Sequence, residues 1–314
     1  MKFREPTIVV PFSENCSNSA CQDIFIYLRP ESNGVTVESA IMRGVTSTSE
    51  LRKHIELAYL ANLPGDFLIR NGVVKNHYKT RVLFAYYGKQ IFTPYMEQEF
   101  YNYFGVSVKD AVVVGAYQAM KLMKISADEL FGLWVPVDDM LQVNDQTIKK
   151  VGDMYVINND IPAIIDRNNN KTDIAVMIFR TDYFGEDFYN VILRMTDILI
   201  DEGVLDSRSK FSHVFHYSKG PFEQILDAVG FLYDERGNHL PLEKIRFYRY
   251  LKKRGFDRGK IEHTLQDPIF LFSLGDSCVE DSIFNRTKSL GYPESLEMMN
   301  AAKAQVFLDN YDVP

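Results

Sequence analysis

The sequence has few cysteines and no long apolar run. Its three cysteines, Cys16, Cys21 and Cys278, are scattered over 314 residues at no metal-ligand spacing. An odd number of scattered cysteines fits a reducing compartment better than a disulfide framework. No stretch approaches the roughly 18 uninterrupted apolar residues of a membrane span, and residues 1–11 lack the apolar core of a secretion signal. These absences predict a cytoplasmic protein without a membrane segment.

The sequence also lacks the common catalytic motifs. It contains no G-x-G-x-x-G, no G-x-x-x-x-G-K-[ST], no G-x-S-x-G and no H-E-x-x-H. The corresponding dinucleotide-binding, phosphate-loop, serine hydrolase and zinc protease sites are therefore not expected. An enzyme whose site is assembled from distant residues stays possible, and no cofactor is predicted.

The composition is that of a folded protein with an acidic balance. Hydrophobic residues make up 46% and charged residues 25% of the chain, and 22 Phe and 18 Tyr supply ample apolar surface for a core. A net charge of −7 repels phosphate backbones, so broad binding to nucleic acid or to an anionic membrane is disfavoured.

The first third of the chain indicates strands, one helix and a hairpin. Apolar, β-branched runs predict strands at 7–12 and 23–29. A capping box from Ser47 to Glu50 predicts a helix over 49–63, ended by Pro64-Gly65. Further strands are expected at 66–71 and 80–86, the second turning into 90–92.

Helices and a polar connection should follow. Thr93-Pro94 predicts a helix that ends at Gly105, and capping-box offsets predict two more helices after Ser107 and Ser126. Residues 137–150 are polar and read as an exposed connection. We therefore expect two domains, 1–136 and 151–314, with their boundary in 137–150.

The second half should begin with a small sheet and continue mostly as helix. Strands are expected at 154–157, 161–165 and 174–179, a hairpin at 231–240, and helices at 186–199, at 221–229 and over much of the chain from Leu242. The predicted fold class is α+β, with a strand-rich N-terminal region followed by helices, then a small sheet with a largely helical C-terminal half.

A basic segment, 242–266, stands out in the acidic chain. Helical spacing places Ile245, Tyr248 and Leu251 on one face and Arg246, Arg249 and Lys253 on the other, with Gly255 ending the helix. A solvated helix face is the common explanation of such a pattern. The functional alternative is a non-catalytic binding or regulatory protein that contacts an acidic protein or a phosphate-bearing partner through five residues of the helix (244–260): Arg246, Arg249, Lys252, Lys253 and Arg254.

The residues from Tyr250 to Phe256, followed by Ile261 and Leu265, resemble one tandem-helix repeat of the RecX family of recombinase regulators. The similarity is confined to 242–266, while the rest of the chain has strands and long insertions that the family lacks. What the resemblance implies here is a helix–glycine–helix geometry.

Two further functions stay open. His213 and His216 are spaced for a shared metal ion on a helix, which would suit a metal-assisted hydrolase, although packing of two partly exposed histidines is the more ordinary explanation. Alternatively, exposed aromatic side chains could be buried in a homo-oligomer, the candidates being Tyr86, Tyr87, Tyr101 and Tyr103.

Overall fold

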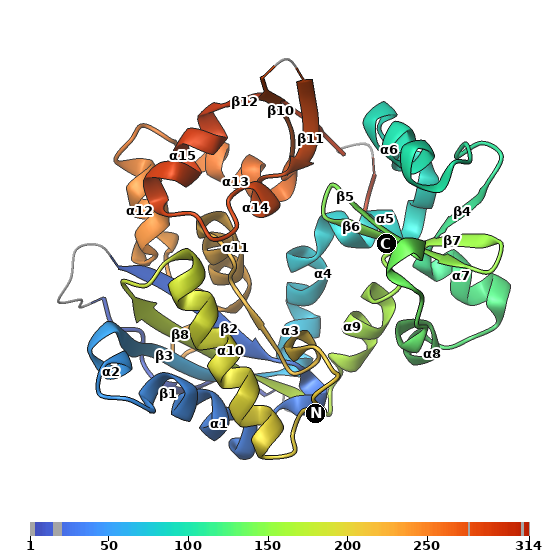
Figure 1. Cartoon of the computed structure of the whole chain (residues 1–314). Coiled ribbons are helices and arrows are strands. Elements are labelled where there is room, and N and C mark those ends of the chain that lie inside the picture. The colour runs from blue at the N-terminus through green and yellow to red at the C-terminus, as the bar shows by residue number, and fades with distance from the viewer. Residues whose placement is uncertain (1–3, 15–20, 276, 309–310, 314) are drawn as a thin grey trace. The chain divides into compact units, whose positions relative to one another are not determined.

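The computed structural model describes residues 4–14, 21–275, 277–308 and 311–313. Its internal contacts divide the chain into two compact units, each assembled from three segments. Unit 1 comprises 1–77, 168–258 and 287–297, and unit 2 comprises 78–167, 259–286 and 298–314. The predicted α+β class is confirmed, because both units combine sheets with helices (Figure 1).

Unit 1 is built on a five-stranded sheet with the order β1-β3-β8-β2-β9, in which all neighbours are antiparallel. Its strands are β1 (Thr7–Val10), β2 (Gln22–Leu28), β3 (Ile55–Pro64), β8 (Asp173–Thr181) and β9 (Phe215–Tyr217). Helix α1 (Val35–Thr46) connects β2 to β3, and α10 (Gly185–Asp201) connects β8 to β9. Strands β2, β3, β8 and β9 thus have the order and direction of a ferredoxin-like βαββαβ unit, extended at one edge by β1.

The first face of this sheet is covered by α1 and α10, which enclose an apolar core (Figure 1). The strands contribute alternate residues such as Ile24 and Ile26. Helix α10 contributes an apolar stripe at helical spacing: Phe188, Val191, Ile192, Met195 and Leu199. The two helices approach closely at Gly44, where a Cβ atom would lie 2.6 Å from Cγ of Met195. A larger residue at this position would therefore have to push the helices apart.

Short helices cover the second face. They are α3 (Gly65–Arg70), α4 (Val73–His77), α11 (Pro221–Phe231) and α12 (Arg246–Lys252). Helix α11 packs on β2 and on α4, and α12 packs on α11. Unit 1 also contains η1 (Pro30–Ser32), α2 (Leu51–His54), η4 (Phe211–His213), η5 (Leu242–Lys244) and the first part of α15 (Tyr292–Asn300).

Unit 2 has two smaller sheets. The first has the order β4-β7-β6-β5 and consists of β4 (Val112–Gly115), β5 (Met140–Val143), β6 (Gln146–Val151) and β7 (Met154–Ile157). The second has the order β11-β10-β12, with β10 (Ile269–Leu274), β11 (Ser277–Ser282) and β12 (Ala302–Gln305). The helical elements are α5 (Lys79–Tyr87), η2 (Gly88–Ile91), α6 (Pro94–Phe104), α7 (Ala116–Met123), α8 (Ala127–Gly132), η3 (Val137–Asp139), α9 (Ile161–Arg167), most of α13 (Arg258–Gln266) and α14 (Ile283–Arg286).

Several elements predicted from local signals are confirmed. Thr93 caps α6 through a bond from the Met96 amide, and Gly105 ends it in the left-handed conformation. Ser126 and Glu129 form the predicted capping box of α8. Helices α10 and α11 and the strands β2, β7 and β8 also occupy their expected places.

Other elements differ from the prediction. The expected helix over 49–63 is only α2, followed by strand β3, because this apolar run pairs with β1 on one side and β8 on the other. The expected strands at 66–71, 80–86 and 161–165 are the helices α3, α5 and α9. Part of the C-terminal half expected to be helical forms β10, β11 and β12.

The expected connection at 137–150 is structured. It contains η3 and the hairpin of β5 and β6, which turns at Asn144 and Asp145, both at positive φ. Polar turn residues between two short strands are what such a hairpin requires. The segment lies inside unit 2, and whether the predicted halves fold independently stays a prediction.

No helix among the described residues is long and apolar enough to cross a membrane.

Candidate functional site

Helix α12 carries the predicted basic surface at its C-terminal end. Ile245, Tyr248 and Leu251 are buried as expected, and Phe247 is buried as well, so the solvent-facing side of the helix is narrower than predicted. Gly255 follows with φ +86°, and α13 begins at Arg258. The order of helix, glycine and helix along the chain is thus as expected from the sequence.

Two of the five predicted contact residues are engaged within the chain. The backbone amide of Arg246 donates to Asp23, and Nη1 of Arg249 contacts Glu14 and donates to the carbonyls of Glu243 and Lys244. Lys244 also pairs with Glu14. These contacts hold the start of α12 in place, Arg246 through its backbone amide and Arg249 through its guanidinium.

The other three predicted residues are exposed. Within the described ranges, the side chains of Lys252 and Lys253 form no ion pair or hydrogen bond. The guanidinium of Arg254 lies 3.5 Å from the centroid of the Tyr250 ring, a cation–π contact that orients it. We call Lys252, Lys253 and Arg254 the α12 basic surface.

The structure does not bring His213 and His216 together as a metal site. His213 is exposed in η4, whereas His216 lies in β9 and stacks on Tyr27 with ring centroids 4.6 Å apart. In the part of the chain that the structure describes, no three His, Cys, Asp or Glu side chains are arranged to hold a metal ion.

His216 instead belongs to a buried polar cluster on the second face of the sheet. Nε2 of His77 lies 3.5 Å from Oδ1 of Asp227, and Nε2 of His216 lies 3.6 Å from Oδ2 of the same carboxyl group. Ser218 donates to that Oδ2 at 2.5 Å. Asp227 therefore joins helix α11 to α4 and β9, since its partners come from both.

Two more side chains complete the cluster. Oη of Tyr27 lies 3.4 Å from Nε2 of His77, and Glu223, one turn before Asp227 on α11, lies 3.5 Å from Nε2 of His216. Glu223 also accepts a hydrogen bond from the backbone amide of Lys219. The cluster is thus held by side chains from β2, α4, β9 and α11.

Burial controls the ionisation of this cluster. Burial raises the pKa of Asp227 to about 6 and raises the pKa of Glu223. It lowers the pKa of His77 to about 4, against the opposing attraction of Asp227. Desolvation penalises every charged form. The two acids therefore stay protonated to higher pH than in water, and the imidazole of His77 stays neutral to lower pH.

The geometry of the cluster does not suit nucleophilic catalysis. Ser218 donates its hydroxyl hydrogen to Asp227 at 2.5 Å, and its oxygen accepts a hydrogen bond from the backbone amide of Phe25 at 3.1 Å, so both sides of the hydroxyl are engaged in the fold. The side chains of His77 and Asp227 are enclosed, with 3% and 0% of their surface exposed. These two groups join α4 to α11 in the interior of unit 1.

Sequence reasoning missed this cluster apart from His216. A signal was present, because α11 is otherwise strongly apolar yet carries Glu223 and Asp227 four residues apart. Side chains at that spacing share one helix face, and a carboxylate on a buried face needs partners. The partners themselves lie far away in the sequence.

A second buried polar contact fixes β2 to its neighbour. Arg180 of β8 donates from Nε to Asp23 of β2 at 2.8 Å, and both side chains are almost fully enclosed. Nη1 of Arg180 donates to the carbonyl of Ser13. The pair also anchors the start of α12, because Asp23 accepts a hydrogen bond from the backbone amide of Arg246.

The tyrosines expected in an oligomer contact differ in exposure. Tyr101 and Tyr103 are 54% and 44% exposed. Tyr86 stacks on Tyr117, and Tyr87 donates its hydroxyl to the carbonyl of Asp312. Tyr101 and Tyr103 are therefore the more exposed two of the four, and Tyr86 and Tyr87 are half-buried.

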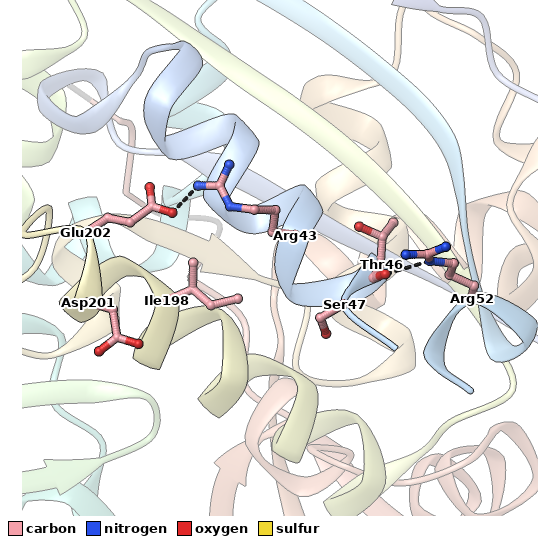
Figure 2. Close-up of a pocket in the computed structure, with 7 residues that line it drawn as sticks. All are labelled: Arg43, Thr46, Ser47, Arg52, Ile198, Asp201 and Glu202. Carbon is pink, nitrogen blue, oxygen red and sulfur yellow. Dashed lines mark hydrogen bonds and ion pairs between the residues drawn. The ribbon is translucent and has the colours of Figure 1, made fainter. Parts of the chain in front are cut away.

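An open pocket lies where α1 and α10 end (Figure 2). Arg43 pairs with Glu202, and Nε of Arg52 donates to the carbonyl of Thr46 at 2.6 Å, which caps the end of α1. Figure 2 shows both arginines turned to these intramolecular partners. The cations of this pocket therefore compensate its own carboxylate and helix end, in contrast to the α12 basic surface.

Comparison of the chain with protein-family models, curated proteins and solved structures gave no match.

Proposed function

We propose that the chain is a binding or regulatory protein that contacts an acidic protein segment through the α12 basic surface. One observation carries the proposal: three successive cationic side chains are exposed at one helix end, and Lys252 and Lys253 have no carboxylate partner within the described ranges. Unpaired cations of this kind favour an anionic partner.

An acidic protein segment suits this surface better than a nucleic acid. Three charges neutralise few phosphates, and the net charge of −7 opposes the approach of a long polyanion. A short acidic segment is affected mainly by the positive charges of Lys252, Lys253 and Arg254 close to it, and less by the net charge of the whole chain. The buried cluster under α11 gives no comparable support to a catalytic function, since His77 and Asp227 at its centre are enclosed.

The test compares variants in binding to a fluorescently labelled oligoglutamate peptide. Lys252→Glu/Lys253→Glu should weaken binding by about tenfold or more, since two attractive charges become repulsive. The exposed pair Lys171→Glu/Lys210→Glu, which makes the same change in net charge, should bind as the native chain does. Binding should also weaken at high salt.

Equal affinity of the native chain and the Lys252→Glu/Lys253→Glu variant would refute the proposal. Arg249→Glu is unsuitable for this test, because Arg249 holds Glu14 and two backbone carbonyls. A labelled oligothymidylate serves as the comparison. Tighter binding to oligothymidylate than to oligoglutamate would show that the surface prefers a nucleic acid to an acidic protein segment.

A further inference from the structure

Unit 2 exposes an apolar patch beside two aspartates. The side chains of Trp134 and Val137 are 82% and 76% exposed, and both lie in the short segment after α8. The Tyr103 hydroxyl donates to the carbonyl of Val137 at 3.1 Å, which places the end of α6 against η3. We call Tyr103, Trp134, Val137, Asp138 and Asp139 the Trp134 patch. Large exposed apolar groups gathered in this way are typical of an interaction surface.

The charge of the patch is negative. Asp138 is exposed and Asp139 half-buried in η3, and neither forms an ion pair with another described residue. A partner must therefore offer cations next to a surface that an indole ring can contact. An arginine side chain of the partner meets both requirements. Its guanidinium carries a positive charge for the aspartates and can stack on the indole ring of Trp134.

The same chain carries a surface with these complementary properties. Lys252 and Lys253 supply two exposed ammonium groups, and Arg254 presents its guanidinium on the Tyr250 ring. We propose that the Trp134 patch binds the α12 basic surface of a second copy of this chain. The inference rests on the proposed function, whose acidic partner it identifies as Asp138 and Asp139 of another copy.

Such a contact joins two different surfaces. The first contact leaves a free basic surface on one copy and a free patch on the other. A second, reciprocal contact between the same two copies closes a two-fold dimer, and contacts with further copies build rings or open chains. The overall negative charge of the copies opposes the assembly, and the local attraction between the two surfaces is screened by salt. We therefore expect association at high protein concentration and its loss at high salt.

Trp134 is the only tryptophan of the chain and so reports directly on the patch. With increasing protein concentration at low salt, its emission should shift to shorter wavelength and its quenching by acrylamide should fall. Light scattering on the same samples should show a mass above that of one chain. High salt should reverse both changes.

Charge reversal separates this contact from nonspecific association. Asp138→Lys/Asp139→Lys and Lys252→Glu/Lys253→Glu should each stay monomeric, with the Trp134 emission of the dilute native chain. A mixture of the two variants should regain the shift, because each reversed surface then meets an oppositely charged one. Lys171→Glu/Lys210→Glu, the control, should assemble as the native chain does.

A native chain that stays monomeric with unchanged Trp134 emission would overturn the inference. So would variants that assemble as the native chain does, or a mixture that fails to associate. These outcomes are distinct from failure of the proposed function: a monomeric chain whose oligoglutamate binding is lost in Lys252→Glu/Lys253→Glu keeps the function and loses only this partner.

Discussion

At the scale of single residues, His77 and Asp227 exchange their usual roles on folding. In the unfolded chain the imidazole has a pKa of 6.5 and the carboxyl group a pKa of 3.8. Between these two pH values the imidazole is protonated and the carboxyl group is ionised. In the folded chain the pKa of Asp227 is about 6 and that of His77 about 4. Folding therefore favours the protonated form of Asp227 and the neutral form of His77, because burial penalises the charged form of each.

The two contributions to stability have opposite signs. The raised pKa of Asp227 contributes stability that is fully present below pH 3.8 and is lost as pH rises through about 6. The lowered pKa of His77 contributes stability that is present above pH 6.5 and is lost as pH falls through about 4. Between about pH 4 and pH 6 the two contributions to the pH dependence of the unfolding free energy largely cancel.

Single substitutions should expose each contribution. On acidification from pH 6.5 to 4.5, Asp227→Asn should lose stability relative to the native chain, by roughly 1 kcal/mol per pH unit. His77→Gln should gain stability over the same range. Urea unfolding at several pH values measures both, with the exposed Asp197→Asn of α10 as control. Parallel pH profiles of all four proteins would contradict the assigned pKa directions.

At the scale of elements, the contact between α1 and α10 depends on one residue without a side chain. Gly44 lies in α1 against Met195 of α10, so a Cβ atom would also approach the Cα atom of Met195 to 3.2 Å. A helix prefers almost any residue to glycine, so its presence here reflects packing rather than helix propensity.

Gly44→Val should destabilise unit 1 by about 1–3 kcal/mol, since overpacking forces the helices apart. Gly132→Ala, in α8, is the control, because no atom lies within 4 Å of its added Cβ and alanine favours the helix. Thermal and urea unfolding measure both variants. An unchanged midpoint for Gly44→Val would mean that α1 and α10 do not pack as described.

At the scale of the whole molecule, each unit is interrupted in the sequence by the other. Strand β8 lies between β2 and β3 in the sheet, yet residues 78–167 of unit 2 separate it from them in the chain. In unit 2, β7 pairs with β4 and β6, which precede it. A cut near the polar hairpin at 137–150 separates strands that belong to one sheet.

Fragments 1–136 and 151–314 should therefore fail to fold alone. The first would carry β2 and β3 without the strand between them, and the second would carry β7 without both of its neighbours. Unpaired central strands leave buried backbone groups without hydrogen bonds. Amide exchange and urea unfolding of each fragment measure this, and cooperative unfolding of either fragment would support the domain boundary predicted from the sequence.

The sequence by itself determined the elements that have explicit start and stop signals. Thr93-Pro94 with Gly105, the Ser126–Glu129 box and the stripe of α10 all act within a few residues, so they do not depend on the rest of the fold. Helical spacing likewise placed Lys253 on the face opposite Ile245, Tyr248 and Leu251, and its side chain is exposed.

Only the tertiary structure decided the elements whose sequence suits more than one state. The run 55–64 is apolar enough for a helix or a strand, and pairing with β1 and β8 makes it β3. Residues 80–86 read as a strand but form α5, whose Val82 to Ala85 are all buried. The same holds for Arg249 and for the partners of Asp227, because burial and long-range contacts are properties of the folded chain rather than of local spacing.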